Sequence, residues 1–153
     1  MKYIKNFENN EVKIPKYCEH KSVGILIYND KDEILLIERG TFPFKMAPPA
    51  GHVDDHNSFE EAVMAEVNEE VGLSVTSLKL LGEGKKSNPC RRIDGNWHYW
   101  KIFNAITIGN IKLSEREAKR FEWCNNERLV ELKESQELEQ VWIEWLTELN
   151  IIK

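Results

Sequence analysis

Three glutamates, Glu66, Glu69 and Glu70, occupy the last turns of a short segment that ends at Gly72. Residues three and four positions apart lie on one side of an α-helix, so the three carboxylates share a side. At about 100° per residue, that side overlaps the apolar side that carries Ala62. We therefore expect the acids to point into a partly enclosed space, where oxygen ligands favour a hard cation such as Mg²⁺, Mn²⁺ or Ca²⁺. The alternative is a charged amphipathic helix with solvated acids.

The helix that carries these acids has clear ends. Ser58 can cap its first turn, and Glu61 three residues later completes a capping box. Gly72 is the expected C-terminal stop, with the apolar Leu73 just beyond it. Between the two ends, apolar residues recur at helical spacing, namely Phe59, Ala62, Val63, Val67 and Val71. The pattern predicts a helix from about residue 59 to residue 71.

Together with the loop before it, this helix resembles the Nudix box. That box is a Gly, a Glu after five residues, and then the run Arg-Glu-apolar-any-Glu-Glu-any-Gly-apolar. Gly51 and residues 66–73 match it, whereas Asn57 replaces the earlier Glu and Ala65 replaces the Arg. In the family, the Arg helps to position the neighbouring Glu, and the earlier Glu supports the loop and the metal site. The two departures therefore imply slowed or unusual chemistry.

The resemblance implies a metal-dependent pyrophosphohydrolase that acts on a nucleoside diphosphate linked to another moiety. Glu66, Glu69 and Glu70 would hold Mg²⁺ or Mn²⁺, and a backbone carbonyl at Ala50 or Gly51 could complete the metal ligands. The bound metal would bridge the diphosphate oxygens and lower the pKa of a water. Nucleotide-containing small molecules are thus the expected partners.

A further catalytic acid is implied in the loop that faces the box. Family members often carry a Glu six residues before a Trp, and Glu117 with Trp123 has this spacing, while Glu115 is the alternate. Glu66 or Glu117 would accept the proton of the attacking water, with Glu69 as the third catalytic candidate. A solvated loop acid is the alternative interpretation of Glu117.

Candidate substrate contacts precede the helix. Arg39 and Lys45 flank a loop of Gly, Pro and aromatic residues. Either cation could meet a phosphate, and an aromatic residue could contact a base. Similar loops occur before the box in Nudix enzymes that act on ADP-ribose-like substrates. His52 could stack or hydrogen-bond in the same site, although a locally bonded loop histidine is the simpler interpretation.

The stretch at 82–95 is polar and basic, and it carries Arg91. We expect either a solvated hairpin loop or a mobile flap that closes cations over a diphosphate. Pro89 lies sixteen residues past Leu73, a spacing that resembles the mark of ADP-ribose pyrophosphatases. ADP-ribose or a nucleotide sugar is therefore the favoured substrate. A nucleoside triphosphate pyrophosphohydrolase, or a nucleotide-binding sensor with little turnover, is the alternative.

Residues 1–153 are expected to form one domain, with residues 1–17 as an arm or edge strand. The pattern predicts strands at 20–28, 33–38, 46–49, 74–81, 96–108 and 121–124, and further helices at about 125–132 and 136–150. The first two strands are expected to pair as a hairpin. This order, with the family resemblance, predicts an α/β/α sandwich with a mixed sheet, the box helix on one side and the terminal helix on the other.

Composition narrows the classes of function. The chain is 41% hydrophobic and 31% charged with a net charge of −5, which suits a globular protein and argues against a DNA-binding surface. Neither a signal peptide nor a membrane span is predicted. Cys18, Cys90 and Cys124 are far apart and form no C-x-x-C, so we expect reduced thiols in a cytoplasmic protein and no zinc site. The Trp-rich stripe of the last helix could contribute to a homodimer contact.

Overall fold

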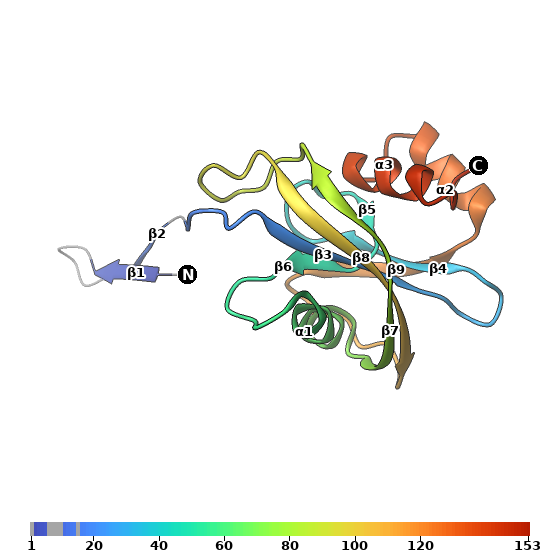
Figure 1. The fold of residues 1–153 in the computed structure, drawn as a ribbon, viewed down its shortest axis with the longest axis horizontal. Helices are drawn as coiled ribbons and strands as arrows, with labels where there is room; N and C mark the ends of the chain where they lie inside the picture. Colours follow the sequence, from blue (N-terminus) through green and yellow to red (C-terminus); the bar gives the residue numbers. More distant parts are fainter. Residues whose placement is uncertain (1, 6–10, 15) are drawn as a thin grey trace.

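The computed structural model describes residues 2–5, 11–14 and 16–153. Six strands precede α1, three strands follow it, and two helices end the described chain (Figure 1). The elements in order are β1 (Lys2–Lys5), β2 (Glu11–Ile14), β3 (Lys21–Ile27), β4 (Ile34–Arg39), β5 (Met46–Ala47), β6 (Ala50–His52), α1 (Phe59–Val71), β7 (Ser74–Lys86), β8 (His98–Ile108), β9 (Ala118–Cys124), α2 (Asn126–Glu134) and α3 (Gln140–Glu148).

Two sheets form the middle layer. One has the order β6-β3-β8-β7 and the other the order β5-β4-β9. The first sheet is mixed, because β3 is parallel to β8 and antiparallel to β6. Helix α1 lies on one side of the strands, and α2 and α3 lie on the other (Figure 1). The predicted α/β/α sandwich with a mixed sheet is therefore confirmed.

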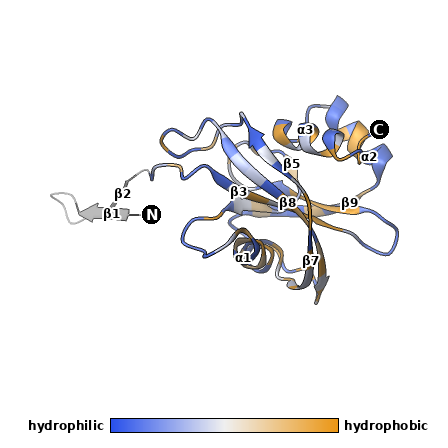
Figure 2. Ribbon diagram, viewed as in Figure 1, coloured by the Kyte–Doolittle hydropathy of each residue, from blue (hydrophilic) through white to orange (hydrophobic). Residues whose placement is uncertain are grey.

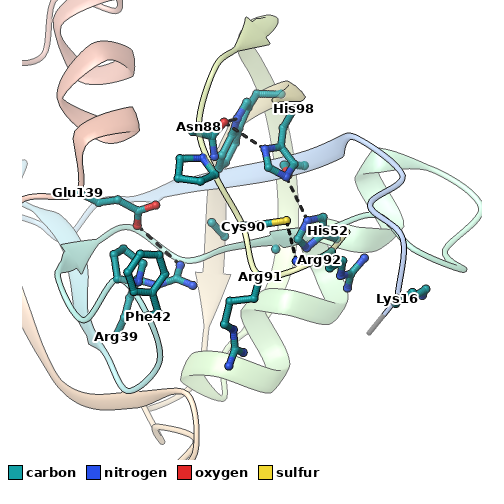
Figure 3. A pocket seen from close by; sticks show the side chains of 16 residues that line it. Lys16, Arg39, Phe42, His52, Asn88, Cys90, Arg91, Arg92, His98 and Glu139 are labelled. Atoms are coloured by element: carbon teal, nitrogen blue, oxygen red, sulfur yellow. Dashed lines mark hydrogen bonds and ion pairs between the residues drawn. The ribbon is translucent and has the colours of Figure 1, made fainter. Parts of the chain in front are cut away.

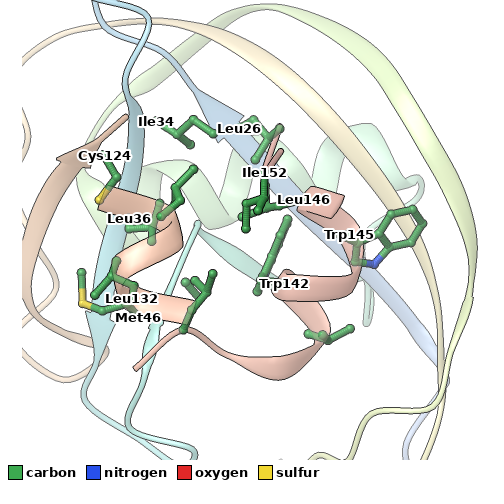
Figure 4. Packing of buried hydrophobic residues seen from close by; sticks show 14 of the residues in the cluster. Leu26, Ile34, Leu36, Met46, Cys124, Leu132, Trp142, Trp145, Leu146 and Ile152 are labelled. Atoms are coloured by element: carbon green, nitrogen blue, oxygen red, sulfur yellow. The ribbon is translucent and has the colours of Figure 1, made fainter. Parts of the chain in front are cut away.

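The central strands are buried on both faces, and each face belongs to a different core. Leu26 of β3 and Leu36 of β4 belong to the core under α2 and α3 (Figure 4), whereas Ile25 and Leu35 belong to the core under α1. Residues 23–27 of β3 and 34–37 of β4 are therefore continuous apolar runs rather than alternating ones. Figure 2 shows hydrophobic colour along the sheet layer and mostly hydrophilic colour on the loops. The sheet layer thus holds the two helical layers apart, with a core on each side.

The expected hairpin between residues 20–28 and 33–38 is wrong. Both stretches are strands, but in the described part of the chain only one bridge, Tyr28 with Ile34, joins them. Both edges of β3 are taken, by β6 and β8, and β4 pairs instead with β5 and β9. A strand that is buried on both faces and paired on both edges lies in the middle of a sheet. The turn signal between the two strands does not indicate that β3 has this central position.

Helix α1 forms as its end signals predict. The Oγ atom of Ser58 accepts the backbone N–H of Glu61 at 3.0 Å, and the Glu61 carboxylate accepts the N–H of Asn57 at 3.1 Å. Gly72 ends the helix with φ of 72°, a left-handed conformation that glycine adopts without steric cost. The helix buries Ala62, Val63, Val67, Glu70 and Val71.

Several boundaries differ from expectation; for example, β9 begins at Ala118 rather than at residue 121. Strand β7 continues to Lys86, so the expected loop at 82–95 is strand in its first part. Helix α3 begins at Gln140, because Leu138 forms a bridge with Met46 instead of a helical turn. At the N-terminus β1 and β2 pair with each other, while the parts of the expected arm at residues 1, 6–10 and 15 lie outside the described residues. No helix among the described residues has the length and apolar character to span a membrane.

Gly24 provides a test of the packing under α3. A Cβ at this position of β3 would collide with the indole ring of Trp142. We expect Gly24→Ala to lower the free energy of unfolding in urea by about 1–3 kcal/mol, because the core would be overpacked. Gly24→Ala combined with Trp142→Phe should cost less than the sum of the single variants, since the smaller ring makes room. Additive effects in this cycle would contradict the contact.

Candidate functional site

Two carboxylates of α1 pack against the backbone of β6. A Cβ at Gly51 would collide with the carboxylate of Glu66, so the glycine lets this side chain reach the sheet. The backbone N–H of Ala50 lies 3.4 Å from Oε1 of Glu70. The structure thus brings together Gly51, Glu66 and Glu70, three of the residues that the sequence suggests as metal ligands.

Burial changes the acidity of this group. Glu70 is only 6% exposed, and burial, with Glu66 beside it, raises its pKa well above the ordinary value. Burial raises the pKa of Glu66 to about 7, and the charges of Glu69 and Glu117 contribute. The pKa of Glu117 is raised by burial and by Glu69. Each of these shifts reflects the cost of holding several anions in one partly dry place.

Glu69 departs from its predicted place, because its side chain is exposed rather than enclosed. It is one residue before Glu70, and so lies about 100° round the helix axis from it, at the edge of the buried side. Its charge still acts on Glu66 and Glu117, since it raises the pKa of both. Glu69 therefore stands at the rim of the carboxylate group.

The carboxylate group fits a hard divalent cation. Its donors are carboxylate oxygens, which Mg²⁺ and Mn²⁺ prefer. Oε2 of Glu117 is buried, and in the described part of the chain it has no hydrogen-bond partner. The bare backbone at Gly51 leaves the space that Glu66 uses. A buried oxygen without a partner, among other anions, is what a bound cation would satisfy.

Arg39, the last residue of β4, lies between this group and a second acid. Burial raises the pKa of Glu70 and of Glu117, and the guanidinium of Arg39 opposes both shifts. On its other side, Nη1 of Arg39 is 3.7 Å from Oε2 of Glu139. Arg39 thus joins the carboxylate group to the adjacent cavity.

This cavity, of about 420 Å³, contains most of the expected substrate contacts (Figure 3). Arg39, His52 and Arg91 line it, together with Gly51 and Pro89. The fourth expected contact, Lys45, lines an adjoining hollow of about 150 Å³ instead. Three of the four predicted side chains, which are far apart in sequence, therefore line the same cavity.

Several residues that line the cavity were not singled out from the sequence. They are Lys16, Phe42, Asn88, Arg92, Trp100 and Glu139. Arg92 is held by two contacts of 2.5 and 3.0 Å to Asp54, and this pair lowers the pKa of Asp54 to about 2. Glu139 precedes α3 and looked like part of an amphipathic helix. The one feature of the sequence that could have indicated Glu139 is that it is an acid at the start of an otherwise apolar stripe.

The match to a family model covers both the box and the rest of the fold. A model described as the NUDIX domain matches residues 19–146. The chain belongs to the Nudix hydrolase family. The match includes the carboxylate helix, the loop with Glu117 and most of α3, so the family assignment rests on the whole sandwich rather than on the box alone.

Relatives agree with this assignment. An ADP-ribose pyrophosphatase of Methanocaldococcus jannaschii is 35% identical over 117 residues, which is 72% of this chain and 67% of that protein. A protein of Caenorhabditis elegans named as a nudix hydrolase is 29% identical over 74% of this chain, and the match spans 31% of its length. The crystal structure of a MutT protein from Methanosarcina mazei Go1 has a TM-score of 0.71 at 22% identity, with 91% of this chain and 96% of that chain covered.

Gly51→Ala tests the geometry of the carboxylate group. We expect the added Cβ to displace Glu66 and to weaken Mn²⁺ binding about 10- to 100-fold, the range found when support of a metal ligand is lost. Isothermal titration with Mn²⁺ measures this. The matched control is Gly82→Ala in β7, whose nearest neighbour is the flexible end of Leu149 at 3.2 Å. Equal Mn²⁺ affinity in the two variants would contradict the role of Gly51.

Proposed function

We propose that this Nudix protein hydrolyses a nucleoside diphosphate linked to another moiety, with Mg²⁺ or Mn²⁺ as cofactor and ADP-ribose or a nucleotide sugar as the favoured substrate. The observation that supports this most is the adjacency of the carboxylate group and a cavity lined by cations, with Arg39 between them. A cation-binding site beside an arginine-lined cavity suits a diphosphate. The 35% identical relative named as an ADP-ribose pyrophosphatase supports the choice of substrate class.

Glu66 and Glu70 would hold the metal, and Glu69 would contribute from the rim, while the bare backbone at Gly51 leaves room for Glu66. A divalent cation bound there supplies charge neutralisation for the diphosphate oxygens and makes water more acidic. The protein's contribution is to fix the carboxylates before the substrate arrives. Because Glu70 is buried and Glu66 is partly buried, little reorganisation is needed on binding.

Glu117 is the favoured proton acceptor for the attacking water, with Glu66 as the other candidate. Its backbone is fixed at both ends: its N–H donates to Ser114 at 3.1 Å, and its carbonyl accepts from Gly40 at 2.9 Å. Its Oε2 is buried and has no partner among the described residues. Glu115, the alternate from the sequence, is exposed. Position and acceptor capacity therefore both favour Glu117.

The cavity provides contacts for the rest of the substrate. Arg39 and Arg91 would neutralise the non-bridging phosphate oxygens, with Lys45 further out. Phe42 lines the cavity with 52% of its surface exposed, so its ring is available to stack on a base. His52 is not assigned to the substrate, because its Nε2 lies 3.3 Å from Nε2 of His98.

The test is a product assay with Mg²⁺ or Mn²⁺ and a panel of ADP-ribose, nucleotide sugars, dinucleoside polyphosphates and nucleoside triphosphates. We expect cleavage of the diphosphate of ADP-ribose or a nucleotide sugar to two monophosphates. Faster turnover of a triphosphate to a monophosphate and pyrophosphate would overturn the substrate class. Tight binding without turnover of any compound would overturn the enzymatic function and favour a sensor.

Isosteric variants test the roles of the acids. We expect Glu66→Gln and Glu117→Gln each to lower kcat by about 100- to 10,000-fold, the range for loss of an acid–base residue. Steady-state kinetics at saturating Mg²⁺ measures the change. Glu60→Gln, at an exposed position in the first turn of the same helix, is the control and should keep full activity. If Glu115→Gln abolished turnover and Glu117→Gln did not, the assignment of the base would be reversed.

A further inference from the structure

Two cysteines and two histidines form a compact group beside the cavity, and three of the four line it. They are Cys18, His52, Cys90 and His98, and one ligand atom from each lies within 4.8 Å of every other. Cys18 and His98 are buried, and the other two are partly buried. Figure 3 shows His52, Cys90 and His98 pointing toward one another. The proposed hydrolysis does not use this group.

The distances fit a tetrahedral metal. The Nε2 atoms of His52 and His98 are 3.3 Å apart, and Sγ of Cys18 lies 3.8 Å from the first and 3.3 Å from the second. Zinc bonds of about 2.3 Å to sulfur and about 2.0–2.1 Å to nitrogen place tetrahedral ligands about 3.4 Å apart for two nitrogens and about 3.6 Å apart for nitrogen and sulfur. Cys18, His52 and His98 are therefore spaced as a Zn²⁺ site would require, and a ligand atom of Cys90 lies within 4.8 Å of each of them.

The protonation of His98 also points to a metal. Asn88 Oδ1 lies 3.0 Å from Nε1 of Trp100 and 3.2 Å from Nδ1 of His98. An indole N–H can only donate, so the Asn88 atom that faces both rings is the oxygen, and it accepts from His98 Nδ1–H as well. Nε2 of His98 then carries a lone pair toward the group. A second-shell oxygen that fixes the tautomer in this way is typical of a metal-binding histidine.

Both sulfurs receive backbone hydrogen bonds of the same kind. The N–H of His20 donates to Sγ of Cys18 at 3.3 Å, and the N–H of Arg92 donates to Sγ of Cys90 at 3.4 Å. In each case the donor is two residues after the cysteine. At Cys18 this bond opposes the rise in pKa that burial causes, and so favours the thiolate, which is the form that binds metal. Gly95 closes the loop so tightly that a Cβ there would collide with the sulfur of Cys90.

We propose that Cys18, His52, Cys90 and His98 bind one Zn²⁺. Two thiolates and two neutral imidazoles balance the charge of the ion and fill its four positions, so the site is structural rather than catalytic. It joins the segment before β3, strand β6, the loop after β7 and the start of β8. That loop carries Arg91 and Pro89 on the cavity wall. The zinc would therefore fix this loop at the cavity. Its role would be structural, and its site is separate from the carboxylate group.

The test begins with the wild-type chain, purified without a histidine tag from zinc-supplemented medium and dialysed against a weak chelator. We expect about one zinc per chain by elemental analysis. After replacement with Co²⁺, we expect the visible bands of a tetrahedral ion and a near-ultraviolet thiolate-to-cobalt band. The thiolate band distinguishes this site from binding to carboxylates. Absence of stoichiometric metal, or cobalt without the thiolate band, would overturn the proposal.

Matched variants locate the ligands. Cys90→Ser and His98→Asn should each abolish the thiolate–cobalt spectrum or reduce Co²⁺ affinity at least 100-fold. Cys124→Ser and His56→Asn, the same substitutions outside the group, should leave it unchanged. If the ligand variants fail to fold, alkylation in the Cys124→Ser protein decides: Zn²⁺ should protect both remaining thiols, and a lack of protection would overturn the site. A Cys18–Cys90 disulfide found by mass spectrometry in freshly purified, unreduced wild-type protein would also overturn it.

Asn88→Ala tests the positioning of His98. We expect Co²⁺ affinity to fall about 10- to 100-fold, the usual effect of losing a second-shell partner, while the form of the spectrum is kept. Asn88→Asp, which retains an oxygen for both donors, should restore most of the affinity. Equal affinity in wild type and Asn88→Ala would show that the tautomer of His98 is not fixed by this contact.

Discussion

The packing of Glu66 against the bare backbone of Gly51 is the contact on which the rest of the site depends. It requires α1 to lie close to β6, and the apolar side of α1 provides this by burying Ala62, Val63 and Val67 in the core below the sheet. Burial of carboxylates is unfavourable without a compensating charge. Packing of the apolar core therefore keeps the carboxylates in a position that is unfavourable on its own. A bound cation would compensate their charge.

This arrangement also bears on the two departures from the box. Ala65 cannot supply the positive charge that an Arg gives the family's site, but Arg39 acts electrostatically on Glu70 and Glu117 from the end of β4. Asn57 cannot act as a carboxylate, and its backbone N–H is instead bonded to Glu61 at the start of the helix. The altered positions thus leave the end of α1 intact, and part of the positive charge that Ala65 lacks comes from Arg39 in strand β4.

Local features were predictable from the sequence, and long-range pairing was not. Ser58 and Gly72 set the ends of α1 through contacts within a few residues, so their effect could be read directly. The hairpin prediction failed because β3 finds its neighbours in β6 and β8, and no local pattern encodes a parallel partner. Glu69 was predicted to be enclosed because helical spacing shows which side of a helix a residue is on, but not where the buried part of that side ends. The Cys/His group was missed because spacing rules for zinc assume ligands in adjacent pairs.

The parallel pairing of β3 with β8 has a consequence for how the chain acquires its structure. All of β4, β5, β6, α1 and β7 lies between these two strands in sequence. Closing so long a segment is slow, and topologies dominated by distant contacts fold on the slower side of the range for small domains. During synthesis at the ribosome, the edge of β3 that pairs with β8 stays unpaired until β8 has been made. The candidate site draws on residues on both sides of β8, because Glu66 and Glu70 precede this strand and Glu117 follows it, so it can be complete only after β8 has been synthesised.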